Sequence, residues 1–119
     1  MSTQDYIRAT RYEQLVRNAF NCDRGSRNGA DLSYMQNVMA MERGETYAKH
    51  LGTFEKQFEK VKSYVSKALL KLSKTNPYKR ESLFFLQLEQ GIEDCYSTSQ
   101  LLKIVDDAMD RVIELKTDN

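Results

Sequence analysis

Residues 45–74, ETYAKHLGTFEKQFEKVKSYVSKALLKLSK, contain the pattern that decides the fold of this chain. Apolar residues recur there at alternating spacings of four and three, the heptad pattern of a helix with one buried stripe. The stripe consists of Tyr47, Leu51, Phe54, Phe58, Val61, Val65, Ala68 and Leu72. An unbroken helix over this stretch would be about 45 Å long. Aromatic members, with Tyr64 and Leu69 widening the stripe, favour a bundle core over a two-stranded zipper.

The chain before this stretch predicts two further helices separated by a loop. Apolar periodicity predicts the first over about Thr3–Asn21. Residues 21–30 contain two glycines and two asparagines and predict a mobile loop. The second helix is expected to have Ser33 as its N-cap, because a glutamine stands three residues later. Gly44 either ends this helix or kinks it into the next, so residues 31–74 form two helices or one bent helix.

Two more helices are expected after residue 74. Asn76 and Pro77 predict the start of a helix over Tyr78–Cys95, because proline suits the first helical position. Four consecutive apolar residues at positions 83–86 predict burial on most sides, which places this helix at the centre of the core. The chain as a whole, residues 1–119, is therefore expected to be one all-α domain. Its architecture is an antiparallel bundle of four or five helices around the long helix 45–74.

The stretch Tyr96–Leu101 contains the sequence signature of a helix start. Ser97 is expected to be the N-cap, Gln100 to reach back to the preceding backbone, and Tyr96 to pack on Leu101. The heptad stripe of the helix that follows consists of Leu101, Val105, Ala108, Val112 and Leu115, widened by Leu102, Ile104, Met109 and Ile113.

Charge is distributed unevenly along a chain whose net charge is +1. Residues 1–48 carry six basic and six acidic residues, and residues 49–80 carry nine basic and two acidic residues. Residues 81–119 carry three basic and nine acidic residues. A uniformly basic nucleic-acid binder would not show this asymmetry. It indicates instead basic and acidic helices that partly neutralise each other.

Composition and motifs exclude several classes of protein. No apolar run approaches the roughly 18 residues of a spanning helix, so no membrane partner is expected. The N-terminus lacks the layout of a signal peptide. Cys22 and Cys95 are too few for a disulfide scaffold and are expected to be free thiols in the cytoplasm.

No catalytic, cofactor or metal site is predicted. The single histidine, His50, cannot supply the paired Glu-x-x-His motifs of a ferritin-like di-iron site. Walker, dinucleotide-binding and zinc motifs are also absent. Histidine-phosphotransfer domains also carry their histidine on a bundle helix, but Thr53 and Phe54 stand where those domains usually have lysine and glycine. An ordinary flanking histidine is the favoured interpretation.

Lysines line the outer side of the 45–74 helix at heptad positions f and c. They are Lys49, Lys56, Lys60, Lys67 and Lys74. A solvated helix face is the favoured interpretation, and an anionic partner such as nucleic acid is the alternative. Lysine lacks the bidentate recognition that arginine provides, and no exposed aromatic pattern accompanies the stripe. Leu70 also lies at an f position among these lysines, where a monomer would leave it exposed.

Two further groups are candidate interface residues. Asp106, Asp110 and Glu114 recur every four residues on the outer face of the last helix. Because like charges at this spacing repel, cations from the lysine-rich helix or from a second subunit are expected nearby. The other group, Met35, Met39 and Met41, is interpreted mainly as core filling and alternatively as an adaptable interface.

The predicted function is that of a non-catalytic binding or assembly protein acting through helix faces, such as a small regulatory subunit, adaptor or chaperone-like factor. Its expected partner is another protein, first of all a second copy in a homodimer. Three observations motivate the dimer: the length of the 45–74 helix, the exposure of Leu70, and the complementary charges of the middle and the end of the chain. The alternative is a nucleic-acid-associated accessory protein that uses the lysine face.

Overall fold

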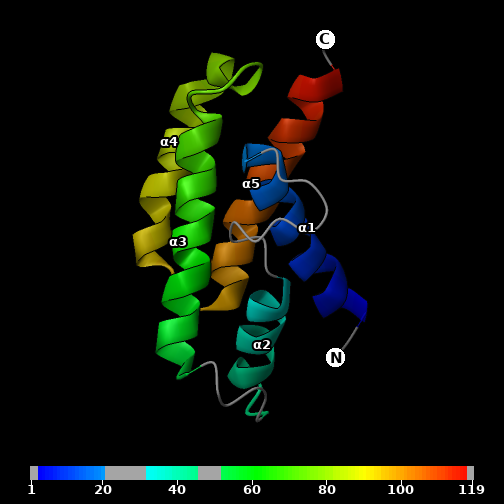
Figure 1. The fold of residues 1–119 in the computed structure, drawn as a ribbon, viewed down its shortest axis with the longest axis vertical. Coiled ribbons are helices and arrows are strands. Elements are labelled where there is room, and N and C mark those ends of the chain that lie inside the picture. Colours follow the sequence, from blue (N-terminus) through cyan, green and yellow to red (C-terminus); the bar gives the residue numbers. More distant parts are fainter. Residues whose placement is uncertain (1–2, 21–31, 46–51, 118–119) are drawn as a thin grey trace.

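The computed structural model describes residues 3–20, 32–45 and 52–117. Within these ranges the chain forms α1 (Thr3–Phe20), α2 (Leu32–Glu42), α3 (Phe54–Leu72), α4 (Ser82–Gln90) and α5 (Thr98–Thr117). Short 3-10 helices at Tyr78–Glu81 and Gly91–Asp94 flank α4. Successive helices run in opposite directions along the long axis (Figure 1), so the predicted all-α antiparallel bundle is confirmed.

Helix α3 is shorter than the predicted helix 45–74. Gly52 has a φ of +105°, in the left-handed region that favours glycine, and Thr53 is extended. The hydroxyl of Thr53 accepts a hydrogen bond from the backbone N–H of Lys56 at 3.3 Å, so the helix begins at Phe54. Its 19 residues extend about 28 Å. Tyr47 and Leu51 lie outside the described residues, whereas the apolar stripe from Phe54 onward faces the core as predicted.

Helix α2 ends at a glycine-containing turn. The N–H of Gly44 donates to the carbonyl of Met41 at 3.0 Å, and the N–H of Glu45 donates to that of Ala40 at 3.1 Å. With Gly44 at a φ of +83°, this is the left-handed termination that glycine commonly provides. In the described part of residues 31–74, α2 and α3 are therefore separate helices. The prediction of Ser33 as the N-cap is wrong, because α2 already begins at Leu32.

The predicted central helix 78–95 is neither continuous nor central. Pro77 precedes a 3-10 turn that has no side-chain cap, so Asn76 does not cap it, and α4 has nine residues. In α4 only Phe85 is fully buried, and Leu83 is 68% exposed. Helix α4 packs mainly on α3 at the edge of the bundle (Figure 1). Four apolar residues in a row indicated burial, but they could not indicate from how many sides neighbouring helices would supply it.

The start of α5 follows the predicted capping box. The hydroxyl of Ser97 accepts from the N–H of Gln100 at 3.2 Å, and Oε1 of Gln100 accepts from the N–H of Ser97 at 3.1 Å. The packing of Tyr96 on Leu101 was predicted wrongly, because the Tyr96 side chain is exposed. All five residues of the predicted heptad stripe are buried, whereas Ile113 is exposed.

One hydrophobic cluster connects the described helices, with α1, α3 and α5 at its centre. Tyr12, Leu15 and Val16 of α1 are fully buried, although Ile7, which the periodicity assigned to the same face, is exposed. The radius of gyration is 14.0 Å, close to the value of about 14 Å expected for this length. Because α3 fits within these dimensions, its length no longer requires a second subunit to cover it.

Candidate binding surface

Three of the five predicted lysines, Lys56, Lys60 and Lys67, lie exposed on the outer side of α3, Lys74 is exposed just beyond its end, and Lys49 lies outside the described residues. Lys56, Lys67 and Lys74 point away from the core. Lys60 instead contacts α2, because its Nζ lies 4.7 Å from the ring centroid of Tyr34 and donates to the hydroxyl of that tyrosine at 3.3 Å. Lys60 is therefore held against α2, and it separates Lys56 from Lys67 and Lys74 along the chain.

The strongest concentration of positive charge lies at the C-terminal end of α3 and in the turn before α4. We define the basic end as Lys67, Lys71, Lys74, Lys79 and Arg80. All five side chains are exposed, and no hydrogen bond or ion pair joins them to another described residue. The nearest carboxylate downstream in the sequence, that of Glu81, is bound to Arg111 instead. This end lies at one pole of the long axis, at the top of Figure 1.

Two exposed leucines lie close to these cations in the sequence. Leu70 is 37% exposed and shares the outer face of α3 with Lys67, and Lys74 follows just beyond the end of the helix. Leu83 is 68% exposed and follows Arg80 by three residues, in the first turn of α4. The sequence interpretation included Leu70, Lys67 and Lys74 but missed the other members. A signal for them existed, since no acidic residue occurs between Glu59 and Glu81.

The acidic residues of α5 are neutralised within the chain, and not by the lysine-rich helix. Nε of Arg11, on α1, lies 3.1 Å from Oδ1 of Asp106, and Nη2 of Arg11 lies 2.6 Å from Oδ1 of Asp110. Glu114 is paired with Arg111 at 2.7 Å. The hydrogen bond with Glu114 and the neighbouring charge of Glu81 raise the pKa of the Arg111 guanidinium. The expected cations are therefore present, but they come from α1 and from α5 itself.

The methionines of α2 occupy the interior. Met35 and Met39 are buried in the core cluster, so in this fold they present no free surface to a partner. Met41 is half-buried beside a polar contact in which Nδ2 of Asn37 donates to Oε1 of Gln57. Nε2 of Gln57 also donates to the carbonyl of Gly52 at 2.8 Å. These contacts join α2 to the start of α3.

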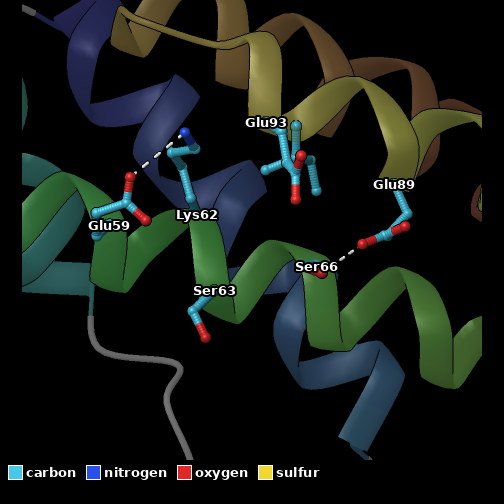
Figure 2. Close-up of a pocket in the computed structure, with 7 residues that line it drawn as sticks. Glu59, Lys62, Ser63, Ser66, Glu89 and Glu93 are labelled. Carbon is cyan, nitrogen blue, oxygen red and sulfur yellow. Dashed lines mark hydrogen bonds and ion pairs between the residues drawn. The ribbon is translucent and has the colours of Figure 1, made fainter.

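A shallow groove of about 430 Å³ lies between α3 and the segment that follows α4 (Figure 2). Its lining residues are Glu59, Lys62, Ser63, Ser66, Glu89, Ile92 and Glu93. Most of the polar groups bind one another. Nζ of Lys62 lies 3.5 Å from Oε1 of Glu59 and donates to the carbonyl of Cys95 at 3.3 Å. The bond from Lys62 to Cys95 joins α3 to the segment after α4, whereas the pair with Glu59 lies within α3.

The groove also contains a serine–carboxylate pair. The hydroxyl of Ser66 donates to Oε1 of Glu89 at 2.8 Å (Figure 2). Nucleophilic catalysis needs a base that a third group orients, together with donors for the developing oxyanion. The described lining supplies no third group hydrogen-bonded to Glu89. The arrangement therefore fits a connection between α3 and α4 better than a catalytic centre.

The remaining candidates for chemistry are inaccessible or lie outside the described ranges. Cys95 is buried, and burial, with the charge of Asp94, raises the pKa of its thiol, although Lys62 opposes this shift. A raised pKa and burial make a thiol unreactive. Cys22 and His50 lie outside the described residues. Within 3–20, 32–45 and 52–117, no group of three or more His, Cys, Asp or Glu residues is placed to hold a metal ion.

An unpredicted contact connects α2 to α5. The carboxylate of Glu42 accepts hydrogen bonds from the backbone N–H of Thr98 at 2.6 Å and from the hydroxyl of Thr98 at 2.7 Å. A carboxylate at a helix N-terminus interacts favourably with the helix dipole. Sequence reasoning missed this contact because the two residues lie far apart in the chain.

Comparison of the chain with protein-family models, with curated proteins and with solved structures found no match. Among the helices of the described ranges, none is both long enough and apolar enough to cross a bilayer.

Proposed function

We propose that this protein is a non-catalytic binding protein that contacts an anionic partner through the basic end. The observation that carries the proposal is the group of five exposed cations without a counter-ion among the described residues, with Leu70 and Leu83 exposed beside them. Protein surfaces usually intersperse charges of both signs. A cluster of one sign repels itself, and an anionic partner relieves that repulsion while it also directs association.

The ordinary alternative for such a cluster is stabilisation of the helix terminus. Cations in the last turn of a helix interact favourably with the dipole, and this accounts for Lys71. It does not account for Lys79 and Arg80, which lie beyond the end of α3 in a 3-10 turn. It also does not account for the exposed Leu83. Stabilisation of the helix terminus therefore explains only part of the basic end.

The experiment is elution from immobilised heparin, a polyanion, along a salt gradient. A triple variant, Lys67→Gln with Lys71→Gln and Lys74→Gln, is compared with a control triple variant, Lys56→Gln with Lys103→Gln and Lys116→Gln. Both variants lose the same formal charge, and all six lysines are exposed. We expect the first variant to elute at clearly lower salt than the second, because binding that depends on charge clusters weakens steeply as counter-ions compete. Equal shifts for the two variants would contradict a localised binding surface.

The homodimer also remains a proposal, but only one of the three observations that motivated it still supports it. The exposure of Leu70 still supports it, whereas α3 is shorter than expected and α5 is neutralised by Arg11 and Arg111. Light scattering at micromolar concentration tests it, and a mass near the 13.9 kDa of one chain would remove it. A cytoplasmic location also remains a proposal, with support from the free thiol of Cys95.

The nucleic-acid alternative rests on the same cations. Four of the five are lysines, which bind phosphate as point charges without bidentate geometry. Duplex DNA is therefore a competing occupant of the basic end, and it is included in the experiments below.

A further inference from the structure

Resting on the proposed function, we infer that the anionic partner of the basic end is a lipid surface, on which the cations meet the headgroups and Leu70 and Leu83 enter the apolar layer. The inference depends on the cations and exposed leucines that are carried by the end of α3 and the start of α4, two segments that lie at one pole of the molecule (Figure 1). Peripheral membrane binding combines the burial of apolar side chains with the attraction of cations to anionic lipids.

The exposed leucines distinguish lipid from other polyanions. A phosphate backbone offers no apolar surface to cover Leu83, which is 68% exposed. An acyl layer does, and transfer of an apolar side chain from water into it is favourable. Leu70 shares the outer face of α3 with Lys67, so both kinds of contact can form in one orientation of the molecule.

Aromatic stacking, on which single-stranded nucleic-acid binding relies, is not supported at this surface. The one aromatic residue within 67–83 is Tyr78, which is buried and makes an edge-to-face contact with Phe85 at 6.4 Å. The next aromatic residue, Phe84, is half-buried and lies under the guanidinium of Arg111 at 5.7 Å. Neither ring is available to a base.

The shape of the surface also favours a flat partner. The end of α3, the turn and the start of α4 form the tip of a helical hairpin at the pole of the molecule (Figure 1). The groove described above has acidic side chains in its lining and lies further along the hairpin, between residues 59–66 and 89–93. The cations thus lie at the pole that the hairpin shares with the C-terminal end of α5, and none of them lines the groove.

The experiment measures co-sedimentation with vesicles of phosphatidylcholine that contain roughly 30% phosphatidylserine, against vesicles of phosphatidylcholine alone. We expect the protein to bind the anionic vesicles and to bind the neutral ones at least about tenfold more weakly, since each lysine near an anionic surface strengthens binding about fivefold. The triple variant at Lys67, Lys71 and Lys74 is expected to lose about 100-fold in partitioning. Failure of the unmodified protein to bind the anionic vesicles would overturn the inference.

The leucines have their own matched control. Leu70→Gln with Leu83→Gln is expected to weaken partitioning about tenfold or more, because an exposed glutamine gains nothing from the acyl layer. Ile7→Gln with Ile113→Gln removes two apolar side chains that are 49% and 48% exposed on α1 and α5, and it should leave partitioning unchanged within about twofold. Equal partitioning of the two double variants would mean that charge alone acts, and the lipid inference would fail.

A fluorescence measurement tests insertion directly and does not depend on removal of a leucine pair. The chain contains no tryptophan, so Leu83→Trp introduces a single reporter. Its emission should shift to shorter wavelength with anionic vesicles, and remain unchanged with duplex DNA, whereas Ile113→Trp should not shift with either. No shift for Leu83→Trp on bound vesicles would contradict insertion.

Retention on heparin without binding to vesicles would leave the proposed function standing and remove the lipid inference, whereas loss of both would remove both.

Discussion

Positively charged side chains lie both at the contact between α1 and α5 and at the basic end of α3. Those at the first site have partners within the chain, whereas those at the second have none among the described residues. In the first region, Arg11 lies between Asp106 and Asp110, and Nζ of Lys116 donates to Oδ1 of Asn18. In the second region, five cations have no partner among the described residues. The first arrangement joins two helices, and the second leaves an unbalanced field at the surface.

The pairing of α5 with α1 explains why the positive charge of the middle of the chain stays unneutralised although the last third is acidic. The acidic last third was expected to neutralise the basic middle, since the two have nearly opposite net charges. In the fold, α1 packs beside α5 and supplies Arg11, so part of the acidic charge is balanced by the nearly neutral first third. The positive charge at the end of α3 is then left without a counterpart. A candidate binding surface thus arises from a pairing elsewhere in the molecule.

The largest expected effect comes from the core that supports both regions. Phe58 is buried and stacks on Phe54 with ring centroids 5.3 Å apart. Phe58→Ala should lower the free energy of unfolding by about 3–5 kcal/mol, the usual cost of truncating a buried phenylalanine. Urea unfolding followed by circular dichroism measures it. A loss below about 1 kcal/mol would place Phe58 outside the core and break the assigned register of α3.

An intermediate effect is expected where α2 holds the start of α5. Glu42→Ala removes the acceptor of both hydrogen bonds from Thr98 and should cost about 1–2 kcal/mol, the range for loss of a helix N-terminal partner. Glu45→Ala is the matched control, because Glu45 contacts only the neighbouring Arg43 at 3.5 Å among described side chains and is exposed. Equal losses in the two variants, measured by urea unfolding, would show that the contact with Thr98 contributes nothing.

The smallest effect sharpens the comparison between the two charged regions. Arg11→Gln should cost about 1 kcal/mol, because Asp106 and Asp110 then repel each other four residues apart on α5. The triple variant Lys67→Gln, Lys71→Gln and Lys74→Gln should change stability by less than about 0.5 kcal/mol, because the lost interaction of Lys71 with the end of α3 is offset by the relief of repulsion among the cations. Unfolding at low and high salt measures both, and salt should shrink the Arg11 effect. A larger cost for the lysine variant would assign these side chains a structural role.

Local patterns predicted the parts of the fold that depend on neighbours in the sequence. The capping box of Ser97 and Gln100 forms as predicted because both partners lie within one turn of α5. The apolar stripe of α3 is buried from Phe58 to Leu72 because helical periodicity alone places these residues on one side. The same stripe predicted a helix that is too long. Gly52 and Thr53 adopt a non-helical backbone, which the heptad spacing does not reveal.

The candidate surface was predicted only in part. Lys67, Lys74 and Leu70 were identified because their positions on the outer side of a helix follow from the heptad. Leu83 was missed because the apolar run at 83–86 indicated burial, and its exposure depends on where α4 lies in the bundle. The isolation of Lys79 and Arg80 depends on Glu81, their nearest acidic neighbour in the sequence, which binds Arg111 of α5.

The sequence by itself determined that this chain is helical, where α5 begins, and which side of α3 and α5 is apolar, because these properties arise from contacts within a few residues. The tertiary structure decided that α4 lies at the edge, that Arg11 neutralises α5, and that Glu42 binds Thr98. Each of these contacts joins residues distant in the chain, and the number of helices packed around a side chain cannot be read from its neighbours in sequence. The charges left unpaired after all such contacts have formed therefore became visible only in the folded molecule.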